Sequence, residues 1–527
     1  MKRSPLAGAC LLALSLMMGS GAAYAKTPPD QLIIGMNMNN LLTLDPAAMT
    51  GNEVVGIVVN LYDSLVELDP NALTNVRPAL ATSWDISPDR KTLTFHLRDD
   101  VKFHSGNPLT AEDVVWSMRR LLHLNLAQAS VWKSYGFSKQ NIDSQISAPD
   151  AYTVQIVLPK PNDPQLVIYS LGALGNLGVL DSKTVQQHAV NNDWGNRWLT
   201  TNEAGSGPFM LKSWRKGQQL VMVPNPHWPG EKPHFKRVSV KIIGESASRR
   251  LQLSRGDLDI ADALPVDQLA ALKQEGKVAV AEYPSLRVTY LYLNNSKPPM
   301  NQVDLRRAVS WATDYQGMVK GILSGNGKQM RGPIPEGMWG FDTNAMQYSF
   351  DEAKAKAALE KVNDKPASLT FLYSDNDPNW EPIALSTQAS LGKLGINVKL
   401  EKLANATMRD RVGKGDYDIA IGNWSPDFAD PYMFMNYWFE SDKKGLPGNR
   451  SFYENKEVDA LLQAALKTTD QAERTKDYQQ AQKVVIDEAA YVYLFQKNYQ
   501  LAMNKEVKGF TFNPMLEQVF NIATMSK

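Results

Sequence analysis

The only cysteine of the 527-residue chain, Cys10, lies in an N-terminal segment that has the pattern of a secretory signal peptide. Lys2 and Arg3 make its beginning positive, residues 6–18 form an apolar run too short to span a bilayer, and Ala-Tyr-Ala at 23–25 is a small-residue cleavage site. Removing these 25 of the 527 residues leaves 502 residues without a thiol. The exported chain therefore has no disulfide or thiolate metal site, and its stability must come from large apolar cores.

Lipid attachment at Cys10 is disfavoured, because this residue precedes most of the apolar run and has no Leu three residues before it. Export without disulfides suits a bacterial periplasm. No later segment approaches 18 uninterrupted apolar residues, so we expect a soluble mature protein. The chain has 56 Lys and Arg against 55 Asp and Glu, which argues against a nucleic-acid partner, since phosphate neutralisation needs a net basic surface.

Short β-rich runs alternate with helical stretches from Gln31 onward, which is typical of an α/β fold. We expect strands at residues 31–35 and 238–243, and a half-buried strand at 92–97. Thr-Ala-Glu-Asp at 110–113 is a capping box that predicts the start of a helix.

Two pairs of similar segments indicate how the chain is organised. Gly-Asp-Leu-Asp-Ile-Ala at 256–261 and Gly-Asp-Tyr-Asp-Ile-Ala at 415–420 each follow a helical stretch and lead into an apolar strand. They favour two lobes of similar α/β construction, or else they are only a common helix-to-strand turn. Aromatic β-rich runs at 288–293 and 490–495 predict a paired, two-strand hinge through which the chain enters and leaves a second lobe.

Patterns typical of catalysis are weak in this chain. Ser64 lacks the flanking glycine of a lipase-like nucleophile turn. The Gly-Asn-Gly-Lys run at 325–328 has Ile where a phosphate loop needs its first glycine, and Gln where it needs Ser or Thr. None of the histidines pairs at helical spacing, so we expect neither a metal site nor a cofactor; they are His96, His104, His123, His188, His227 and His234.

An aromatic and acidic segment at 423–432 is the best candidate for a ligand site. It follows an expected strand at 418–422, which places Trp424 and Asp427 on the loop beyond a strand's carboxyl end, where open α/β sheets bind ligands. Alternatively, Asp427 and Asp430 are turn formers beside the neighbouring prolines.

Motifs in a fixed order carry a resemblance to a known family. They are Leu-Asp-Pro-Ala at 44–47, Arg-Pro-Ala-Leu-Ala-Thr-Ser-Trp at 77–84, the run at 95–106, and Gly-Ser-Gly-Pro-Phe at 205–209. In order and spacing they resemble the dipeptide/oligopeptide-binding family of periplasmic ABC-transporter receptors, solute-binding protein family 5. From residue 205 to the end the chain is most similar to members that bind D,D-dipeptides, especially at 237–264, 331–339 and 423–450.

The resemblance implies an α/β, type II-like periplasmic binding protein fold with two lobes and an additional subdomain in the first. The expected organisation is a signal peptide at 1–25, lobe I at 26–287 with a subdomain inserted at about 66–204, lobe II at 288–494, and a return to lobe I at 495–527. The lobes would close on a ligand by hinge motion and deliver it to an inner-membrane permease with cytoplasmic ATPases.

The resemblance also implies a role for the acidic residue three positions after the tryptophan, which in the family binds the α-amino group of the peptide. Asp427 matches that position, and Trp424 with Trp380 would form apolar walls. A buried ammonium needs such a charged partner, because its burial alone costs several kcal/mol.

The other end of the peptide departs from the family pattern. Dipeptide receptors place an arginine where this chain has Ser374. We therefore expect Ser374 and Tyr373 near the peptide carboxylate, with Arg409 as a counter-charge and Arg287 as an alternative cation. Inverting the Cα atoms exchanges the directions of side chain and carboxylate, so a pocket for D-residues would rearrange this loop.

The expected function is that of a non-enzymatic, monomeric periplasmic receptor for short peptides, above all D,D-dipeptides such as D-Ala-D-Ala. Alternatives on the same fold are an L-di- or oligopeptide, an opine, haem or a nickel chelate as ligand. A periplasmic peptidase is the alternative from another functional class.

Overall fold

The computed structural model describes residues 26–38, 41–49, 52–173, 177–375, 377–445, 448–515 and 520–527, with side chains in α1 (Asn52–Val58) from Val55 onward. The segment predicted to be a signal peptide, with Cys10, lies outside the described residues. Among the described helices, none has the length and apolar character needed to cross a bilayer.

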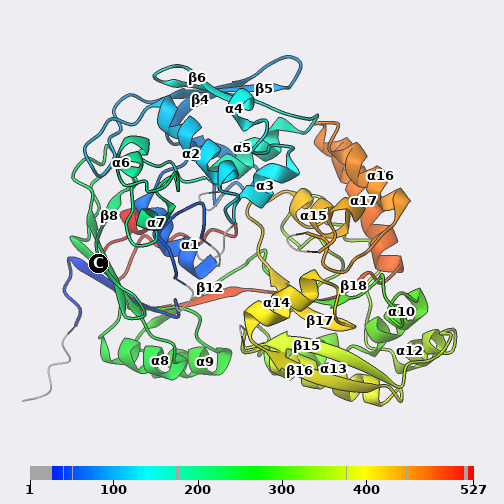
Figure 1. Cartoon of the computed structure of the whole chain (residues 1–527). Helices are drawn as coiled ribbons and strands as arrows, with labels where there is room; N and C mark the ends of the chain where they lie inside the picture. Colours follow the sequence, from blue (N-terminus) through cyan, green and yellow to red (C-terminus); the bar gives the residue numbers. More distant parts are fainter. Residues whose placement is uncertain are drawn as a thin grey trace, which may run out of the picture.

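A seven-stranded sheet joins the two ends of the chain, at the lower left of Figure 1, in the order β12-β19-β11-β1-β10-β9-β8. Its strands are β1 (Gln31–Met36), β8 (Phe209–Arg215), β9 (Gln219–Pro224), β10 (Arg237–Ile242), β11 (Ile260–Ala261), β12 (Ala279–Tyr283) and β19 (Tyr499–Met503). The strands predicted at 31–35 and 238–243 are confirmed as β1 and β10, which pair in parallel.

Both faces of this sheet are covered, because alternate residues of β1 join different cores. Leu32 and Ile34 pack with α1 and the 3-10 turn η1 (Val59–Leu61), whereas Ile33 packs with α8 (Ser246–Arg255) and α9 (Val266–Glu275). The remaining short elements are α6 (Ser182–Gln187), α7 (Asn196–Leu199) and η5 (Ile522–Thr524).

The small unit, at the top of Figure 1, contains a four-stranded antiparallel sheet in the order β4-β5-β7-β6, a separate two-stranded sheet of β2 and β3, and their helices. It comprises β2 (Val66–Leu68), β3 (Val76–Pro78), β4 (Ala81–Ile86), β5 (Thr92–Leu97), β6 (Ile146–Asp150), β7 (Thr153–Val157), α2 (Ala111–His123), α3 (Ala129–Ser134), α4 (Ile142–Gln145) and α5 (Pro164–Gly172). The predicted strand at 92–97 is β5. The predicted capping box is confirmed at α2, where the Thr110 N–H donates to Asp113 Oδ2 (2.9 Å).

A six-stranded sheet, in the order β14-β18-β13-β17-β15-β16, forms the core of the large unit at the lower right of Figure 1. Its strands are β13 (Val288–Leu293), β14 (Gly327–Gln329), β15 (Ser368–Ser374), β16 (Asn397–Leu403), β17 (Ile419–Trp424) and β18 (Tyr491–Lys497). Its helical elements are α10 (Val303–Ala312), α11 (Tyr315–Gly317), η2 (Met318–Ile322), α12 (Glu352–Leu359), α13 (Trp380–Gly392), α14 (Asn405–Gly413), η3 (Pro431–Met433), α15 (Asn436–Phe439), η4 (Ser441–Lys443), α16 (Lys456–Ala465) and α17 (Gln471–Asp487).

The two Gly-Asp-x-Asp segments have the same structure in the two sheets. In each, the glycine has a positive φ (+82° and +70°) between a helix and a strand. Asp259 Oδ2 accepts the N–H of Ile33 in the neighbouring β1, and Asp418 Oδ2 accepts the N–H of Thr370 in the neighbouring β15, both at 2.8 Å. The sequence echo therefore marks equivalent helix–strand units and not only a common turn.

The two aromatic runs form β13 and β18, which pair with each other as predicted, in antiparallel direction, but they are inner strands of the six-stranded sheet and not themselves the connection between the units. The chain passes from the seven-stranded sheet to the large unit at residues 284–287 and returns at Asn498, since β18 extends to Lys497. The two crossings are bonded together: Ser285 Oγ donates to the Lys497 carbonyl (2.8 Å) and Gln496 Nε2 to the Ser285 carbonyl (2.7 Å). The predicted border at 494 thus falls inside β18.

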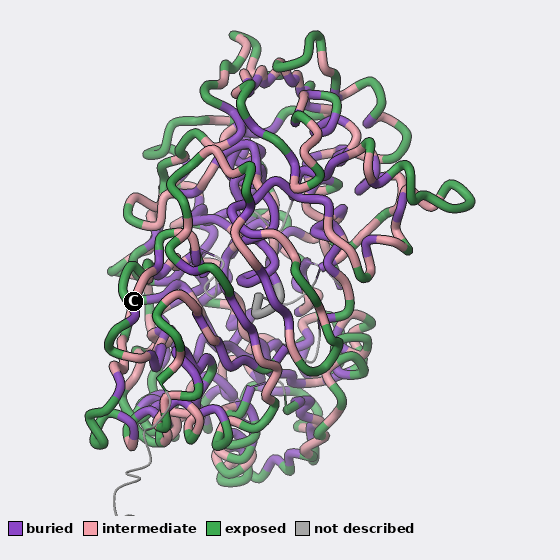
Figure 2. The backbone as a smooth tube through the Cα atoms, turned by 90° about the vertical axis from the view of Figure 1, so that its left-hand side faces the viewer, coloured by how far each residue is buried: buried purple, intermediate pink, exposed green. Residues whose placement is uncertain are grey.

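Buried residues follow the strands through the middle of the molecule, and exposed residues gather on the outer loops, as Figure 2 shows. The buried side chains of the small unit and of the large unit belong to one continuous apolar cluster, separate from the two clusters of the seven-stranded sheet. The two units are therefore packed against each other in this structure.

Candidate functional site

The strand that carries the predicted binding segment is longer than the sequence indicates. The strand was expected at 418–422 with Trp424 beyond it, but β17 extends to Trp424 itself. This occurs because β13 pairs with β17 along its whole length, up to the pair Val288–Trp424. A strand therefore holds Trp424, while Asp427 lies on the following loop, and both residues are partly buried.

Two tyrosine rings of β13 lie against β17 at Gly422. A Cβ atom on Gly422 would lie 2.6 Å from the Tyr292 ring and 2.8 Å from the Tyr290 ring, so only glycine allows both rings to approach. The Tyr491 ring lies 5.2 Å from the Tyr290 ring and 5.4 Å from the Tyr292 ring. These three residues, the tyrosine cluster, form an apolar layer beside the end of β17.

Tyr437 on α15 connects the binding segment to a basic region. Its ring lies 5.3 Å from the ring of Trp424. Burial raises the pKa of Tyr437 to about 12, an effect that Arg450 opposes and Asp427 reinforces. Because charge effects weaken with distance, Tyr437 lies near both an acidic and a basic group.

Two arginines, Arg409 and Arg450, belong to the basic region. Burial, and then the charge of Arg450, lowers the pKa of Arg409, although the Arg409 side chain is open to solvent. Arg450 is partly buried, and its Nη1 donates to the Tyr292 hydroxyl (3.0 Å).

The alternative cation, Arg287, has an acidic partner inside the protein. Its Nη2 lies 3.6 Å from Asp377 Oδ2, and Lys497 Nζ lies 4.0 Å from the same oxygen. Burial raises the pKa of Asp377, whereas the charges of Lys497 and Arg287 lower it. The pKa of Asp377 is lowered overall. The positive charge of Arg287 is therefore balanced next to the two crossings.

Tyr373 and Ser374 are the last residues of β15, and Trp380 is the first residue of α13. Successive side chains of a strand face opposite sides of the sheet, and the Tyr373 hydroxyl donates to Glu381 Oε1 (3.3 Å). Ser374 and Trp380 are buried. Tyr373 and Ser374 therefore cannot both face one ligand group, while Trp424 contacts Tyr437 through their rings.

A buried charge cluster joins the small unit to the loop that carries Asp427. Arg474 on α17 lies 2.9 Å from Asp430 and 3.2 Å from Asp163, the N-cap residue of α5. Asp430 also caps η3 by accepting the Tyr432 N–H (2.8 Å), as the turn-former alternative proposed. Burial raises the pKa of both aspartates, and Arg474 lowers each in part.

Aromatic contacts extend this junction. The Tyr169 ring of the small unit stacks on the Phe428 ring at 5.5 Å, and the Tyr135 ring lies 6.1 Å from the Tyr432 ring. The Tyr432 hydroxyl donates to Ser134 Oγ (3.1 Å). The loop beyond β17 is therefore in contact with the small unit directly after Asp427, at residues 428–432.

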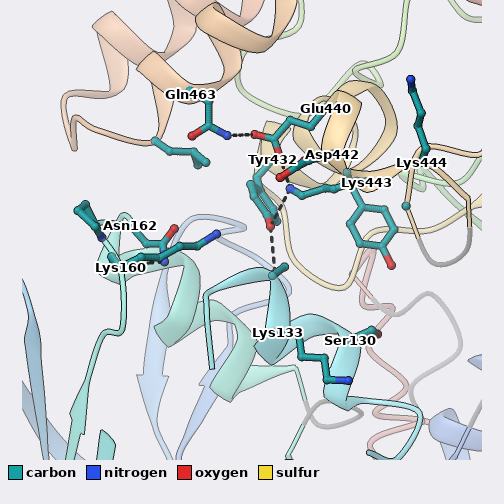
Figure 3. Close-up of a pocket in the computed structure, with 15 residues that line it drawn as sticks. Ser130, Lys133, Lys160, Asn162, Tyr432, Glu440, Asp442, Lys443, Lys444 and Gln463 are labelled. Atoms are coloured by element: carbon teal, nitrogen blue, oxygen red, sulfur yellow. Dashed lines mark hydrogen bonds and ion pairs between the residues drawn. The ribbon is translucent and has the colours of Figure 1, made fainter. Parts of the chain in front are cut away.

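A cavity of about 380 Å³ lies between the small unit and the large unit (Figure 3). Lys133 and Lys160 line it from the small unit, and Lys443 and Lys444 from the large unit. Lys443 points toward the Tyr432 hydroxyl in Figure 3 and is paired with Glu440. Tyr437 forms part of the wall, so the cavity adjoins the predicted site.

Sequence reasoning missed Tyr437, Arg450 and the tyrosine cluster. The alternation of Tyr290 and Tyr292 indicates one aromatic face of a strand, but the run was interpreted only as a hinge strand. Arg450 is 158 residues from Tyr292 in the chain, so no local pattern could have indicated their contact.

Comparison with known proteins adds independent findings. A family model described as bacterial extracellular solute-binding proteins, family 5 Middle, matches residues 75–445. The probable D,D-dipeptide-binding periplasmic protein DdpA of Escherichia coli strain K12 is 66% identical over 530 residues, covering 100% of both chains. The dipeptide-binding protein of the same strain is 27% identical over 473 residues, 87% of each chain.

Among solved structures, the ABC transporter-associated periplasmic binding protein DppA from Helicobacter pylori, in complex with the peptide STSA, has the same fold. Its TM-score is 0.83 at 27% sequence identity, and the match covers 94% of this chain and 98% of that chain.

Proposed function

Because the chain belongs to family 5 of the bacterial extracellular solute-binding proteins, we propose that it is the periplasmic receptor of an ABC importer for D,D-dipeptides such as D-Ala-D-Ala. The observation that carries the proposal is the 66% identity to the probable D,D-dipeptide-binding protein of Escherichia coli over both full lengths. The fold expected from the sequence, an α/β binding-protein fold of two lobes with an additional subdomain, is confirmed by the likeness to the peptide complex.

Asp427 is the proposed partner of the peptide ammonium group. The position of Asp427 on a loop directly after β17, next to Trp424 and Tyr437, supports this role. The carboxylate would stabilise the ammonium in a site from which closure of the units excludes water, where an unpaired charge is costly. Trp424 and Trp380 are the proposed apolar walls.

At the carboxylate end, Ser374 and Tyr373 remain proposed neighbours of the ligand, with Arg409 as a counter-charge. Because Tyr373 and Ser374 face opposite sides of the sheet, only one of the two would contact the ligand directly. Arg409 is favoured over Arg287, because Arg287 already has Asp377 as a partner.

The proposal includes export and delivery. The signal peptide would be cleaved after Ala25, and the mature protein would act as a monomer without enzymatic activity. It would deliver its ligand to permease subunits of the inner membrane that cytoplasmic ATPases drive. The position of Lys26 on the surface, paired with Glu506, is consistent with a mature N-terminus there.

Calorimetry with purified mature protein tests the proposal. We expect saturable binding of D-Ala-D-Ala and much weaker binding of L-Ala-L-Ala. Asp427→Asn should weaken D-Ala-D-Ala binding at least about 30-fold, the usual effect of removing one partner of an enclosed charge pair. Asp410→Asn, which removes an exposed carboxylate of α14, is the matched control and should bind like the wild type.

Equal affinities for the two stereoisomers would contradict the stereochemical part of the proposal. Unchanged binding by Asp427→Asn would contradict the ammonium assignment. The release of free alanine during incubation with the dipeptide would identify a peptidase, whereas a receptor shows a thermal shift without product.

A further inference from the structure

Arg409 and Arg450 are two positive charges of the large unit that no carboxylate of the described residues pairs with. Among the described residues, neither guanidinium has a carboxylate within ion-pair distance. The charge of Arg450 lowers the pKa of Arg409, after the larger effect of burial. Two neighbouring like charges in partly enclosed surroundings raise the free energy of the empty protein.

The hydrogen bonds of Arg450 are also incomplete. Its Nη1 donates to the Tyr292 hydroxyl at 3.0 Å, but its Nε is buried and has no hydrogen-bond partner among the described atoms. The phenols around it are neutral at physiological pH, because burial raises the pKa of Tyr290 and that of Tyr437. A buried N–H of an arginine without an acceptor is costly, and a bound anion would remove that cost.

Other buried arginines of the described chain are satisfied internally. Arg120 forms a 2.6 Å ion pair, and Arg474 lies between two aspartates. Arg306 donates to three backbone carbonyls and Arg249 to four. Against this background, the unbalanced state of Arg450 indicates a place for an acceptor that the chain itself does not supply.

The position of Arg450 fits one particular anion. Arg450 bonds the Tyr292 hydroxyl, and the Tyr292 ring lies against Gly422, near the end of the strand that leads to the loop of Asp427, so both groups belong to the region around the end of β17. A dipeptide spans at most about 7 Å between its ends and carries an ammonium at one and a carboxylate at the other. The planar guanidinium can bind a carboxylate through two parallel hydrogen bonds.

We propose that Arg450, supported by Arg409, binds the C-terminal carboxylate of the peptide. This assignment rests on the proposed function, and it moves the carboxylate partner from the end of β15, where Ser374 stands, to the segment after η4. The tyrosine cluster holds Arg450 in place through Tyr292. Gly422 is part of the same arrangement, because a side chain there would displace the Tyr292 ring.

Binding of two ligands that differ only at the carboxylate tests the assignment. The wild type should bind D-Ala-D-Ala about 10- to 100-fold more tightly than D-alanyl-D-alanine amide, the usual range for hydrogen bonds to charged groups. In Arg450→Gln the free acid should bind as weakly as the amide, so that the ratio of the two affinities falls toward one. Arg450→Lys keeps the charge but not the paired hydrogen bonds, and should give an intermediate ratio.

Arg411→Gln is the matched control, because it removes a guanidinium of α14 that is paired with Glu401 and Asp416. It should keep the wild-type ratio. The thermal midpoint of ligand-free Arg450→Gln should equal or exceed that of the wild type, since no internal ion pair is lost. A lowered midpoint with an unchanged affinity ratio would show a structural role for Arg450 and overturn the inference.

The outcomes separate the two proposals. If the wild type binds D-Ala-D-Ala and Arg450→Gln still prefers the acid over the amide as strongly, this inference fails while the proposed function stands. If the wild type binds neither ligand, the proposed function is wrong, and the inference, which rests on it, is wrong as well.

Discussion

At the scale of single residues, Asp63 is an acid held in an unfavourable environment. Ser206 Oγ donates to its Oδ2 (2.7 Å), and the nearby His104 is paired with Glu203 (2.8 Å). Burial raises the pKa of Asp63 from 3.8 to about 6, and Ser206 and His104 offset this only in part. The residue lies where the small unit leaves the seven-stranded sheet, so its ionisation affects that junction.

The sign of the effect follows from proton binding. Between pH 4 and 6 the folded state keeps the proton on Asp63 while the unfolded state loses it, so stability falls as the pH rises through this window. Asn resembles the protonated acid. Asp63→Asn should therefore raise the free energy of unfolding at pH 7.5 by at most about 3 kcal/mol, and leave it unchanged at pH 4.

Measuring the free energy of unfolding of the wild type and of Asp63→Asn at pH 4 and pH 7.5 checks this expectation. The contributions of the other titrating groups cancel in the difference between the two proteins. A variant that is less stable than the wild type at pH 7.5 would contradict it, and would mean that the ionised Asp63 stabilises the junction.

Asp427 and Arg450 differ in how far the sequence could predict them. Asp427 is part of a local motif, and its spacing from Trp424 is visible in one segment. Arg450 acquires its environment only when β13, β17 and the segment after η4 come together, which depends on tertiary contacts. The internal pairing of Arg287 with Asp377 was unpredictable for the same reason.

At the scale of elements, the local patterns predicted secondary structure well where periodicity and caps were clear. The strand at 92–97 and the capping box at α2 are present as expected. The predicted end of β17 was wrong, because pairing with β13 decides where that strand ends. The contact of α5 and α17 with the Asp427 loop had no sequence signal, since its charges are far apart in the chain.

That contact gives a prediction for Arg474→Met. The substitution leaves Asp163 and Asp430 buried without their cation, which should lower the free energy of unfolding by about 3–5 kcal/mol. Because burial already raises the pKa of both acids, the loss should be smaller at pH 5 than at pH 7.5.

Chemical unfolding of Arg474→Met at the two pH values measures the effect. A variant that also carries Asp163→Asn and Asp430→Asn is the control, and should recover most of the loss. A triple variant as unstable as Arg474→Met alone would show that the packing of the Arg474 side chain, and not its charge, matters.

At the scale of the whole molecule, two short crossings connect the large unit to the seven-stranded sheet, and a separate junction connects it to the small unit. The junction comprises ion pairs, ring contacts and part of a continuous apolar cluster, and the proposed hinge motion would open it while the crossings remain intact. The lobe borders expected from the sequence stay a prediction, but the crossings at 284–287 and Asn498 are where such a hinge would act.

Small-angle scattering tests this arrangement. A compact chain of 502 residues has a radius of gyration of about 23 Å. We expect a larger radius without ligand and a decrease toward this value when D-Ala-D-Ala is added, because the ligand stabilises the junction next to Asp427. Asp427→Asn should show no decrease at the same ligand concentration, and a wild-type radius independent of ligand would contradict hinge closure.

The position of β19 has a consequence for the order in which the exported chain can fold. β19 lies between β11 and β12, and Lys527 Nζ bonds to Thr27 and, at 2.8 Å, to the buried Asp259. The chain crosses the membrane from its N-terminus, so all strands of the large unit emerge before β19. The seven-stranded sheet therefore remains incomplete, without the strand between β11 and β12, until the last 29 of 527 residues have emerged.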